Sequence, residues 1–306
     1  MTQQVAVIGS INVDQILHIQ NLPQPGETIE MTAFSKAAGG KGANQAVAAA
    51  RLGAEVAFIG SVGDDANGQF MHQVLTDAQL DLTGVSVNPQ EATGQAYILL
   101  QATGQNSIII QHGANYALTA EQVRSQASRL QNADTTVAQL EVPIPAICTG
   151  FELAHEAHRL TILNPAPAQD IPEALLQLTD IIVPNETEST KLTGIAIDQP
   201  DGLRANATWF HQQGVPAVII TLGEQGAYVS TRDVASQVPA FPVKAVDTTA
   251  AGDTFIGALA AQLQPDLSNV ISAVRFASMA SALAVQQNGA IPSIPTLTQV
   301  NQALHQ

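Results

Sequence analysis

Residues 247–259 read Asp-Thr-Thr-Ala-Ala-Gly-Asp-Thr-Phe-Ile-Gly-Ala-Leu, and they join an extended approach, Phe241–Val246, to an apolar helix predicted over Phe255–Leu263. Small residues in succession let the backbone turn tightly and bring a ligand close to the main chain. The free amide groups at the start of the helix, together with the helix dipole, favour a negative charge. The segment therefore predicts an anion hole for a phosphoryl group in transfer, built from Ala250, Ala251, Gly252 and Asp253.

Asp253 lies at the mouth of this predicted hole, where its carboxylate could accept the proton of an attacking hydroxyl. A positioned general base contributes roughly 10²–10⁴-fold to a rate. The alternative is that Asp253 only caps the helix, as short polar side chains often do. The Ala-Ala-Gly run before it serves no capping purpose, so the catalytic interpretation is favoured, and the two roles are compatible.

Short β-rich apolar runs alternate with stretches whose apolar residues recur at helical spacing. Predicted strands are Val5–Ile8, Val56–Gly60, Thr135–Leu140, Leu160–Leu163, Ile181–Val183 and Ala217–Thr221. Predicted helices are Ala43–Leu52, Gly68–Ala78, Ala120–Leu130, Pro143–His155, Pro172–Leu178 and Leu203–Gln213. This alternation predicts an α/β fold with a mostly parallel sheet and helices on both faces. Ligands of such sheets bind beyond the carboxyl ends of the strands.

Two segments break the alternation. Asn12–Ile19 alternates apolar and polar residues, and Gln95–Gln101 and Asn106–Gln111 are β runs joined by Thr103-Gly104, which predicts a hairpin. These pieces are inserted where a helix is expected. We interpret them as a small separate sheet that serves as a lid or a dimer contact. The alternative is that they are edge strands of the main sheet.

A second glycine-rich turn, Gly39-Gly40-Lys41-Gly42, opens the helix predicted over Ala43–Leu52. Such a turn can bind an anion or a polar small molecule through its backbone. It is not a Walker A loop, because Ser35 stands where the first glycine belongs and Gly42 where serine or threonine belongs. Taken alone, the cluster indicates a turn or a binding site equally.

Two further polar segments directly follow predicted strands. Asn185-Glu186-Thr187-Glu188 could order Mg²⁺ and its waters, or form the capped, acidic first turn of a helix. Thr221-Leu222-Gly223-Glu224-Gln225-Gly226 could cradle nucleotide phosphates, or form a plain hairpin turn into Ala227–Ser230. The residues alone leave both pairs of alternatives open.

The composition limits the partners. The chain has 306 residues, enough for one large α/β domain, and 11 Lys and Arg against 26 Asp and Glu give a formal charge of -15. An acidic surface repels nucleic acid and anionic lipid, so neither is an expected partner. With so few cations, a polyphosphate must be bound largely by backbone amides, helix N-termini and a metal ion. The single cysteine, the lack of a signal-peptide pattern and the lack of a bilayer-spanning apolar run predict a cytoplasmic protein with no membrane contact.

Taken together, these segments resemble the ribokinase branch of the ribokinase-like (PfkB) carbohydrate kinases. The resemblance runs nearly end to end, from Gly9-Ser10-Ile11-Asn12-Val13-Asp14 to Gly289-Ala290-Ile291-Pro292-Ser293. Its two signatures are the glycine cluster at 39–42 and Asp247–Asp253, and Gln139-Leu140-Glu141, Asn164–Ala168 and Pro184–Glu188 are similar as well. It implies a three-layer sandwich over 1–306 as a single domain. A β-sheet lid, inserted as approximately 12–36 and 93–112, would pair with the lid of a second subunit in a homodimer.

The resemblance also implies an activity, the transfer of the γ-phosphate of ATP to the 5-hydroxyl of D-ribose, with Asp253 as the base. The residues that it places against the sugar are Asn12, Asp14, Gly40, Lys41, Gly42, Asn44, Glu141 and Asp253. Those that it places at the nucleotide are Asn185, Glu188, Thr221, Gly223, Glu224, Gly226, Gly252 and Ser278, with Glu188 serving Mg²⁺ through water. An activating K⁺ ion is implied at Asp247, Thr249, Ala284, Gln287, Gly289 and Ser293, mostly through backbone carbonyls.

Other activities are weighed against this one. Kinases of this family also act on deoxyribose, fructose or nucleosides. A nucleoside kinase needs room and apolar contacts for a base, and the aromatic content of only 4% argues against it. A non-catalytic sugar-sensing relative would keep the fold but lose the base or the anion hole, and both are present here. The chain departs from the family pattern at Ala250, where glycine is frequent, at Ile256, where many members have Asn, and at Ser278, where His can occur near the adenine. The last difference puts nucleotide affinity in doubt, and not the type of reaction.

Overall fold

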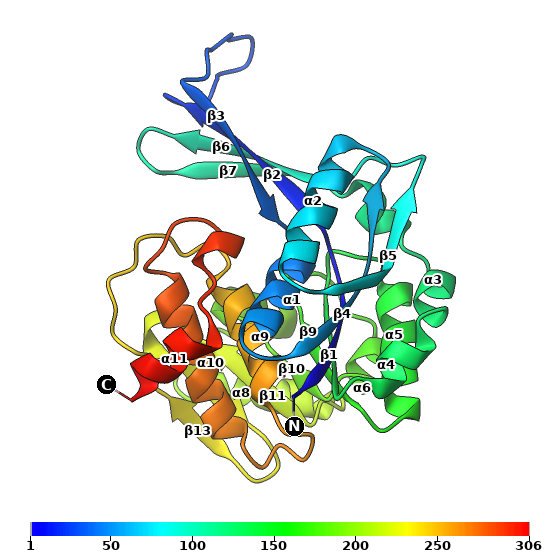
Figure 1. The fold of residues 1–306 in the computed structure, drawn as a ribbon. Coiled ribbons are helices and arrows are strands. Elements are labelled where there is room, and N and C mark those ends of the chain that lie inside the picture. The colour runs from blue at the N-terminus through cyan, green and yellow to red at the C-terminus, as the bar shows by residue number, and fades with distance from the viewer. Residues whose placement is uncertain (1, 306) are drawn as a thin grey trace.

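The central feature of the computed structural model, which describes residues 2–305, is a sheet of nine strands in the order β13-β12-β11-β10-β9-β8-β1-β4-β5 (Figure 1). Its strands are β1 (Gln4–Ile8), β4 (Glu55–Gly63), β5 (Asp81–Asn88), β8 (Thr135–Gln139), β9 (Leu160–Asn164), β10 (Ile181–Ile182), β11 (Ala217–Thr221), β12 (Ala227–Ser230) and β13 (Ala235–Val238). Neighbouring strands from β5 to β11 pair in parallel, and β12 pairs antiparallel with both β11 and β13. This arrangement confirms the mostly parallel sheet.

Helices cover both faces of this sheet, because alternate residues of each central strand point to opposite sides. In β1, Val5 and Val7 belong to one core cluster, and Ala6 and Ile8 to the other. The first cluster is packed under α1 (Lys41–Arg51), α2 (Ala66–Asp77), α9 (Ala251–Gln262), α10 (Val270–Ala284) and α11 (Leu297–Leu304). The second is packed under α3 (Ala120–Arg124), α4 (Ala127–Asn132), α5 (Ile144–Glu156), α6 (Glu173–Gln177) and α8 (Gly202–Gln212). The three-layer sandwich is therefore confirmed.

A separate sheet of four strands projects from the main body (Figure 1). It consists of β2 (Asn12–Ile19), β3 (Ala33–Gly39), β6 (Gly94–Gln101) and β7 (Asn106–Gln111), in the order β3-β2-β6-β7. The hairpin predicted around Thr103-Gly104 is the turn between β6 and β7. We call this four-stranded sheet the lid. The alternative that its strands lie at the edge of the main sheet was wrong.

Several elements differ from the prediction. The helix predicted over Ala120–Leu130 is two short helices, because the chain leaves the helix at Ser125 and Gln126. The extended approach Phe241–Val246 forms no strand. The strands β3, β5 and β13 were not predicted. In residues 2–305, no helix is both long enough and apolar enough to cross a bilayer.

Candidate active site

Asp253 lies in the first turn of α9, and its side chain does not cap that helix. The N-cap position belongs to Ala250, which adopts the left-handed conformation with φ 58 and makes no side-chain cap bond. This conformation explains why glycine is frequent there, since an L-residue with a Cβ is strained in it by roughly 1–2 kcal/mol. The capping interpretation of Asp253 was therefore wrong, and its carboxylate is available for another role.

Two amide side chains of α1 hold the Asp253 carboxylate. Asn44 Nδ2 donates to Asp253 Oδ2 at 2.9 Å, and Gln45 Nε2 donates to Asp253 Oδ1 at 2.9 Å. Asp253 is 8% exposed, so both bonds lie away from bulk water. The carboxylate is thus fixed in one orientation at the start of α9.

Glycines explain how α1 comes so close to its neighbours. A Cβ on Gly42 would lie 2.6 Å from Gly9 Cα at the end of β1, and a Cβ on Gly257 would lie 2.5 Å from Ala48 Cβ. Gly40, the N-cap of α1, has φ 93, a conformation that favours glycine. The glycine cluster at 39–42 therefore serves as a turn, and it places the start of α1 against the strand ends and α9.

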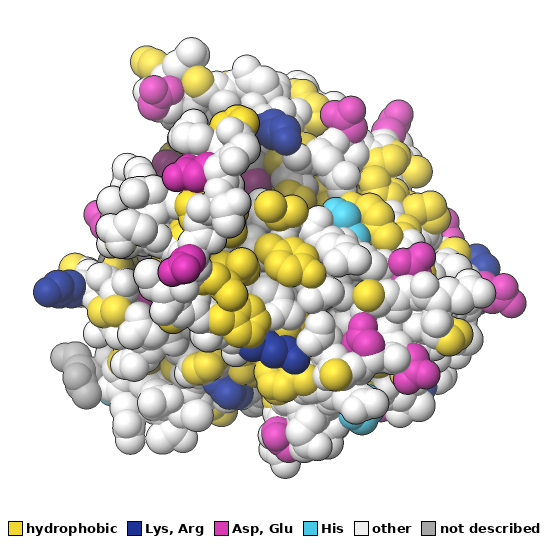
Figure 2. Space-filling model, turned by 90° about the horizontal axis from the view of Figure 1, so that it is seen from above, with side chains coloured by type: hydrophobic (Ala, Val, Ile, Leu, Met, Phe, Trp, Pro, Cys, Tyr) yellow, Lys and Arg dark blue, Asp and Glu magenta, His cyan; other side chains and the backbone are white. Residues whose placement is uncertain are grey.

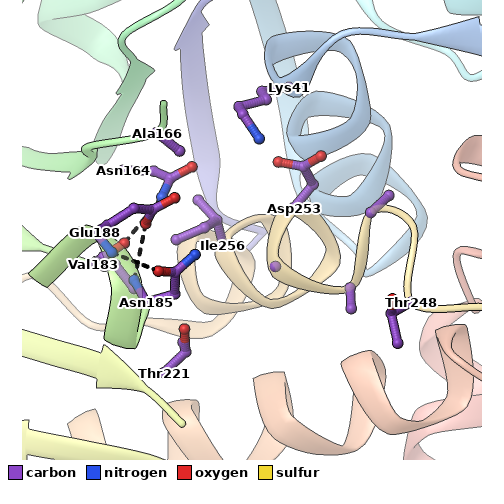
Figure 3. A pocket seen from close by; sticks show the side chains of 13 residues that line it. Lys41, Asn164, Ala166, Val183, Asn185, Glu188, Thr221, Thr248, Asp253 and Ile256 are labelled. Atoms are coloured by element: carbon purple, nitrogen blue, oxygen red, sulfur yellow. Dashed lines mark hydrogen bonds between the residues drawn. The ribbon is translucent and has the colours of Figure 1, made fainter. Parts of the chain in front are cut away.

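A pocket of about 220 Å³ opens beside Asp253 at the carboxyl ends of the strands (Figure 3). Its lining includes Lys41, Asn164, Ala166, Val183, Asn185, Glu188, Thr221, Thr248, Ala250, Ala251, Gly252, Asp253 and Ile256. The strands β9, β10 and β11 each deliver residues to it at or just after their ends, as expected for a parallel sheet. Ile256 lines this pocket, so the family's frequent Asn at that position would face it too.

Two further carboxylates, those of Asp14 and Glu141, lie near Asp253. A Cβ on Gly39 would come within 2.6 Å of both Asp14 carboxylate oxygens, so the carboxylate packs directly over the glycine. Glu141 accepts hydrogen bonds from the Ser10 hydroxyl and, at 3.3 Å, from the Lys41 amide. Burial, with added repulsion from Glu141 and Asp253, raises the pKa of Asp14 to about 6. Glu141 and Asp253 therefore lie close enough to Asp14 for their charges to repel its carboxylate.

Lys41 is the cation among these carboxylates, and its ammonium points toward Asp253 (Figure 3). Burial lowers the pKa of Lys41, but the charges of Asp253, Glu141 and Glu188 outweigh burial and hold the pKa above its ordinary value. Lys41 therefore stays charged. The face of the molecule seen from above carries more acidic than basic side chains (Figure 2), which makes this half-buried cation more important for any phosphate.

Asn12 and Asn44 are both buried, at 5% and 6% exposed. Asn12 Oδ1 accepts from Asn115 Nδ2 at 2.7 Å, and Ile11 N donates to Asn115 Oδ1 at 2.8 Å. Asn115 therefore holds the junction between β1 of the main sheet and β2 of the lid. Asn44 Oδ1 has no partner within residues 2–305. A buried acceptor without a donor suits a ligand hydroxyl.

Asn185 and Glu188 form a reciprocal capping box at the start of α7 (Glu186–Thr193). Asn185 N donates to Glu188 Oε2 at 2.9 Å, and Glu188 N donates to Asn185 Oδ1 at 2.8 Å. Burial raises the pKa of Glu188, and Asp253 adds to this effect, against the lowering by the Asn185 amide and Lys41. The capped-turn alternative is correct, and both side chains also line the pocket (Figure 3).

The segment after β11 is a turn as well. The 3₁₀ helix η2 (Gly223–Gln225) connects β11 to the antiparallel β12, and Leu222 N donates to Gly226 O at 2.8 Å. Gly226 has φ 96, and a Cβ there would lie 2.0 Å from Val238 O, so glycine is required by the fold. Glu224 belongs to this turn, and Thr221 lines the pocket. Ser278 is buried in α10 at 8% exposed.

The two segments implied for K⁺ lie side by side. Val246 N and Asp247 N both donate to Val285 O, at 2.7 Å and 3.1 Å, and Gly289 N donates to Asp247 Oδ2 at 2.8 Å. Burial raises the pKa of Asp247, but hydrogen bonds from Thr249 and the Gly289 amide outweigh it and lower the pKa. Within residues 2–305 there is no group of three or more His, Cys, Asp or Glu side chains placed to hold a metal ion.

Three polar residues at the site were given no role from the sequence. Gln45, Gln139 and Asn164 are buried and bonded to one another behind Asp253. A signal was available: Gln139 is the last residue but one of the predicted strand Thr135–Leu140, and Asn164 directly follows the predicted strand Leu160–Leu163. Polar residues at those positions face the ligand edge of the sheet. Gln45 follows Asn44 in a helix, where its buried position was not evident from the pattern.

Comparison with known proteins agrees with this geometry. The pfkB family carbohydrate kinase pattern matches residues 2–297. Over 303 residues, the chain is 46% identical to the ribokinase of Staphylococcus aureus, covering 99% of this chain and 100% of that protein. It is 45% identical over 305 residues to the bifunctional ribokinase/ribose-5-phosphate isomerase A of Fructilactobacillus sanfranciscensis, and there it spans 99% of this chain but only 56% of the relative.

Among solved structures, a ribokinase of Arabidopsis thaliana complexed with ribose and ATP matches with a TM-score of 0.92 and 34% identity, over 99% of each chain. The match with the family covers nearly the whole sequence. The chain belongs to the pfkB family of carbohydrate kinases.

Proposed function

We propose that this protein is a ribokinase, which transfers the γ-phosphoryl group of ATP to the 5-hydroxyl of D-ribose to give ribose 5-phosphate and ADP. The observation that carries the proposal is the position of Asp253. Its carboxylate lies in the first turn of α9, on the wall of the pocket, and close enough to Asp14 for the two charges to repel each other. A sugar hydroxyl on the Asp14 side and a phosphate at the amides of α9 would meet at Asp253.

Sugar recognition relies on acceptors that are already fixed. In this proposal Asp14, Glu141 and Asn44 present oxygens to the sugar, whose hydroxyls supply the donor that the buried Asn44 Oδ1 lacks. Backbone groups of Gly40 and Gly42 and the Asn12 side chain would complete the sugar site, where β2 meets β3 and α1. Burial of the site makes each of these hydrogen bonds more discriminating than it would be in water.

In the chemical step, Asp253 accepts the proton of the 5-hydroxyl. The sugar oxygen then forms a bond to the γ-phosphorus as the bond from that phosphorus to the bridging oxygen breaks, and its electron pair leaves with ADP. The amides of Ala250, Gly252 and Asp253 and the Lys41 ammonium stabilise the charge on the transferred group. The Ala251 amide already donates to Thr248 O at 3.2 Å, so its predicted place in the anion hole requires that bond to be exchanged. Most of the rate enhancement comes from positioning and charge stabilisation, as in other phosphoryl transfers.

ATP lies along Asn185, Glu188, Thr221, Gly223, Glu224, Gly226, Gly252 and Ser278 in this proposal. Mg²⁺ fits beside Glu188, because only one of its carboxylate oxygens is used by the capping box and Mg²⁺ keeps most of its waters. When bound, Mg²⁺ neutralises charge on the phosphates. The acidic lining makes such a counter-ion necessary for a polyphosphate to enter.

In this proposal K⁺ binds between residues 246–249 and 284–293, two segments that hydrogen bonds hold side by side. The proposed ligands are Asp247, Thr249, Ala284, Gln287, Gly289 and Ser293, mainly through their carbonyl oxygens. The hydrogen bonds from Val246, Asp247 and Gly289 already hold these segments together, so their carbonyls are arranged in advance. When bound, K⁺ adds a positive charge next to the anion hole.

In this proposal the protein forms a homodimer through its lid. Residues 1–306 are then one domain with the lid inserted as approximately 12–36 and 93–112, and two lids pair in a homodimer. The lid exposes large apolar side chains, among them Phe34 at 55%, Ile108 at 54% and Ile109 at 60%. Exposed apolar residues clustered on one small sheet are typical of an interface.

An ADP-release assay over D-ribose, 2-deoxy-D-ribose, D-fructose and nucleosides tests the proposal. We expect D-ribose to give the highest kcat/KM and ribose 5-phosphate as the product. Asp253→Asn should lower kcat by at least about 10²-fold while ribose still binds in a calorimetric titration. ADP release with none of the sugars would refute the activity, and unchanged turnover of Asp253→Asn would remove Asp253 from the mechanism.

A further inference from the structure

A chain of three buried side-chain amides runs from the main sheet to the Asp253 carboxylate. Gln45 Nε2 donates to Asp253 Oδ1 at 2.9 Å and to Asn164 Oδ1 at 3.0 Å. Gln45 Oε1 accepts from Gln139 Nε2 at 2.7 Å. Gln45 is 1% exposed and Gln139 is 0% exposed. Both N–H groups and the oxygen of the Gln45 amide therefore have partners inside the protein.

The direction of this chain is set by a main-chain carbonyl. Asn164 Nδ2 donates to Val183 O at 3.0 Å, and a carbonyl oxygen can only accept. Asn164 must therefore turn its own oxygen toward Gln45. Gln45 donates to that oxygen from its NH₂ group, and the Gln45 oxygen therefore faces Gln139. With the amides oriented in this way, an N–H group, and not an oxygen, meets the Asp253 carboxylate.

Resting on the kinase activity proposed above, we propose that Gln45 is a positioning residue that holds Asp253 as a correctly oriented, ionised base, and that Val183 O fixes the direction of the amide chain Asn164–Gln45–Gln139. A reversed Gln45 amide would set an oxygen against the carboxylate at about 3 Å, and two buried acceptors without a proton between them repel each other. The anchored chain prevents this reversal.

Gln45→Leu removes the N–H donor while keeping a buried side chain of similar size. We expect kcat to fall by about 10–100-fold with the KM for the sugar within about 3-fold, because the lost bond acts on the base and not on sugar binding. Thr136→Val is the matched control: Thr136 lies on β8 with Gln139, is 0% exposed, and its hydroxyl has no partner within residues 2–305.

Gln139→Glu tests the direction of the chain from a residue that does not touch Asp253. At low pH the protonated carboxyl of the variant can donate to Gln45 Oε1 and preserve the chain. Once ionised it can only accept, which draws the Gln45 NH₂ group away from Asp253. The ratio of variant to wild-type kcat should therefore fall by at least about 10-fold as the pH rises. Gln139→Leu offers no competing acceptor, so its ratio to wild-type kcat should not change with pH.

The outcomes are separable. A Gln45→Leu protein that folds and keeps wild-type kcat, or a Gln139→Glu ratio that does not change with pH, overturns the positioning role while the wild type continues to phosphorylate sugar. If Gln45→Leu does not fold, the Gln139→Glu ratio decides alone. A wild type that releases no ADP with any sugar overturns the proposed function first, before any variant is compared.

Discussion

Gly257 of α9 faces Ala48 of α1 so closely that a Cβ at position 257 would lie 2.5 Å from both the Ala48 Cβ and the Gln45 carbonyl oxygen. This contact is one turn from Asp253 and one turn from Asn44. The distance between the two helices at this glycine therefore sets the distance between the base and the two amides that hold it.

Gly257→Ala should separate α9 from α1. We expect a loss of about 1–3 kcal/mol in stability, as for other overpacked cores. kcat should fall as well, since Asn44 and Gln45 move away from Asp253. Thermal melts and the ADP-release assay measure the two effects. The double variant Ala48→Gly/Gly257→Ala should recover only part of the loss, because the Gln45 carbonyl remains in the way. Full recovery would show that side-chain crowding alone sets this spacing.

Asp14→Asn should raise the stability of the free enzyme above pH 6 and lower its affinity for the sugar. The folded-state pKa of Asp14 is raised to about 6, so the folded protein binds a proton more tightly than the unfolded chain. Stability therefore falls as the pH rises from about 4 to about 6, and the full cost persists above that window. Replacing the carboxylate should return roughly 1–3 kcal/mol at pH 7.5 and almost nothing at about pH 4.

Urea unfolding of wild type and Asp14→Asn at pH 7.5 and at about pH 4 measures this difference. A ribose titration at pH 7.5 should show weaker binding by the variant, with kcat less affected, because the lost bonds form in the ground state and transition state alike. An equal stability gain at both pH values would mean that the charge of Asp14 is not the cause.

Asp247→Ala should loosen the proposed K⁺ site, and Asp266→Ala is its control. Both aspartates bond the backbone amide and the hydroxyl of the residue two positions on, Thr249 and Ser268 respectively. Only Asp247 also accepts from Gly289 N across the site. We expect wild-type kcat to be several-fold higher in K⁺ than in Na⁺, a difference that Asp247→Ala abolishes and Asp266→Ala preserves. Equal wild-type rates in the two salts would contradict the site.

Ile109→Glu should dissociate the proposed dimer. Ile109 is 60% exposed on β7 of the lid, and Val87→Glu is a matched control, because Val87 is 57% exposed on β5 of the main sheet. Burying a charge in an apolar interface without a partner is strongly unfavourable. Sedimentation velocity should show a dimer for wild type and Val87→Glu and a monomer for Ile109→Glu. A wild-type monomer at all accessible concentrations would end the proposal.

The sequence predicted the main sheet well because its strands are buried on both faces and read as continuous apolar runs. The strands it missed lack that signal. In β3 the first four residues are exposed, and in β13 the first three are, so neither shows an apolar run or a regular alternation. Their pairing is decided by neighbouring strands, which no local pattern records.

The position of Asp253 in the first turn of a helix, directly after small residues, follows from its local segment and was predicted, whereas its catalytic role stays a prediction. Gln45 shows where this fails. Consecutive helical residues normally point in different directions, yet Asn44 and Gln45 both reach Asp253, each bonding a different oxygen of one carboxylate. That geometry depends on the close approach of α9, which is a tertiary contact. The segment Asn185–Glu188 differs from this case, because Asn185 and Glu188 both cap a helix and line the pocket.

The lid has a further consequence for how the chain folds. Its central pair is parallel, with Asn12 beside Gly94, although α1, β4, α2 and β5 all lie between these strands in the sequence. Such a distant pairing pays its loop-closure entropy before it gains any contact. During synthesis, one edge of β2 therefore stays unpaired until β6 has left the ribosome. Pulse-labelling hydrogen exchange should show protection of β2 amides appearing after that of β1 and β4.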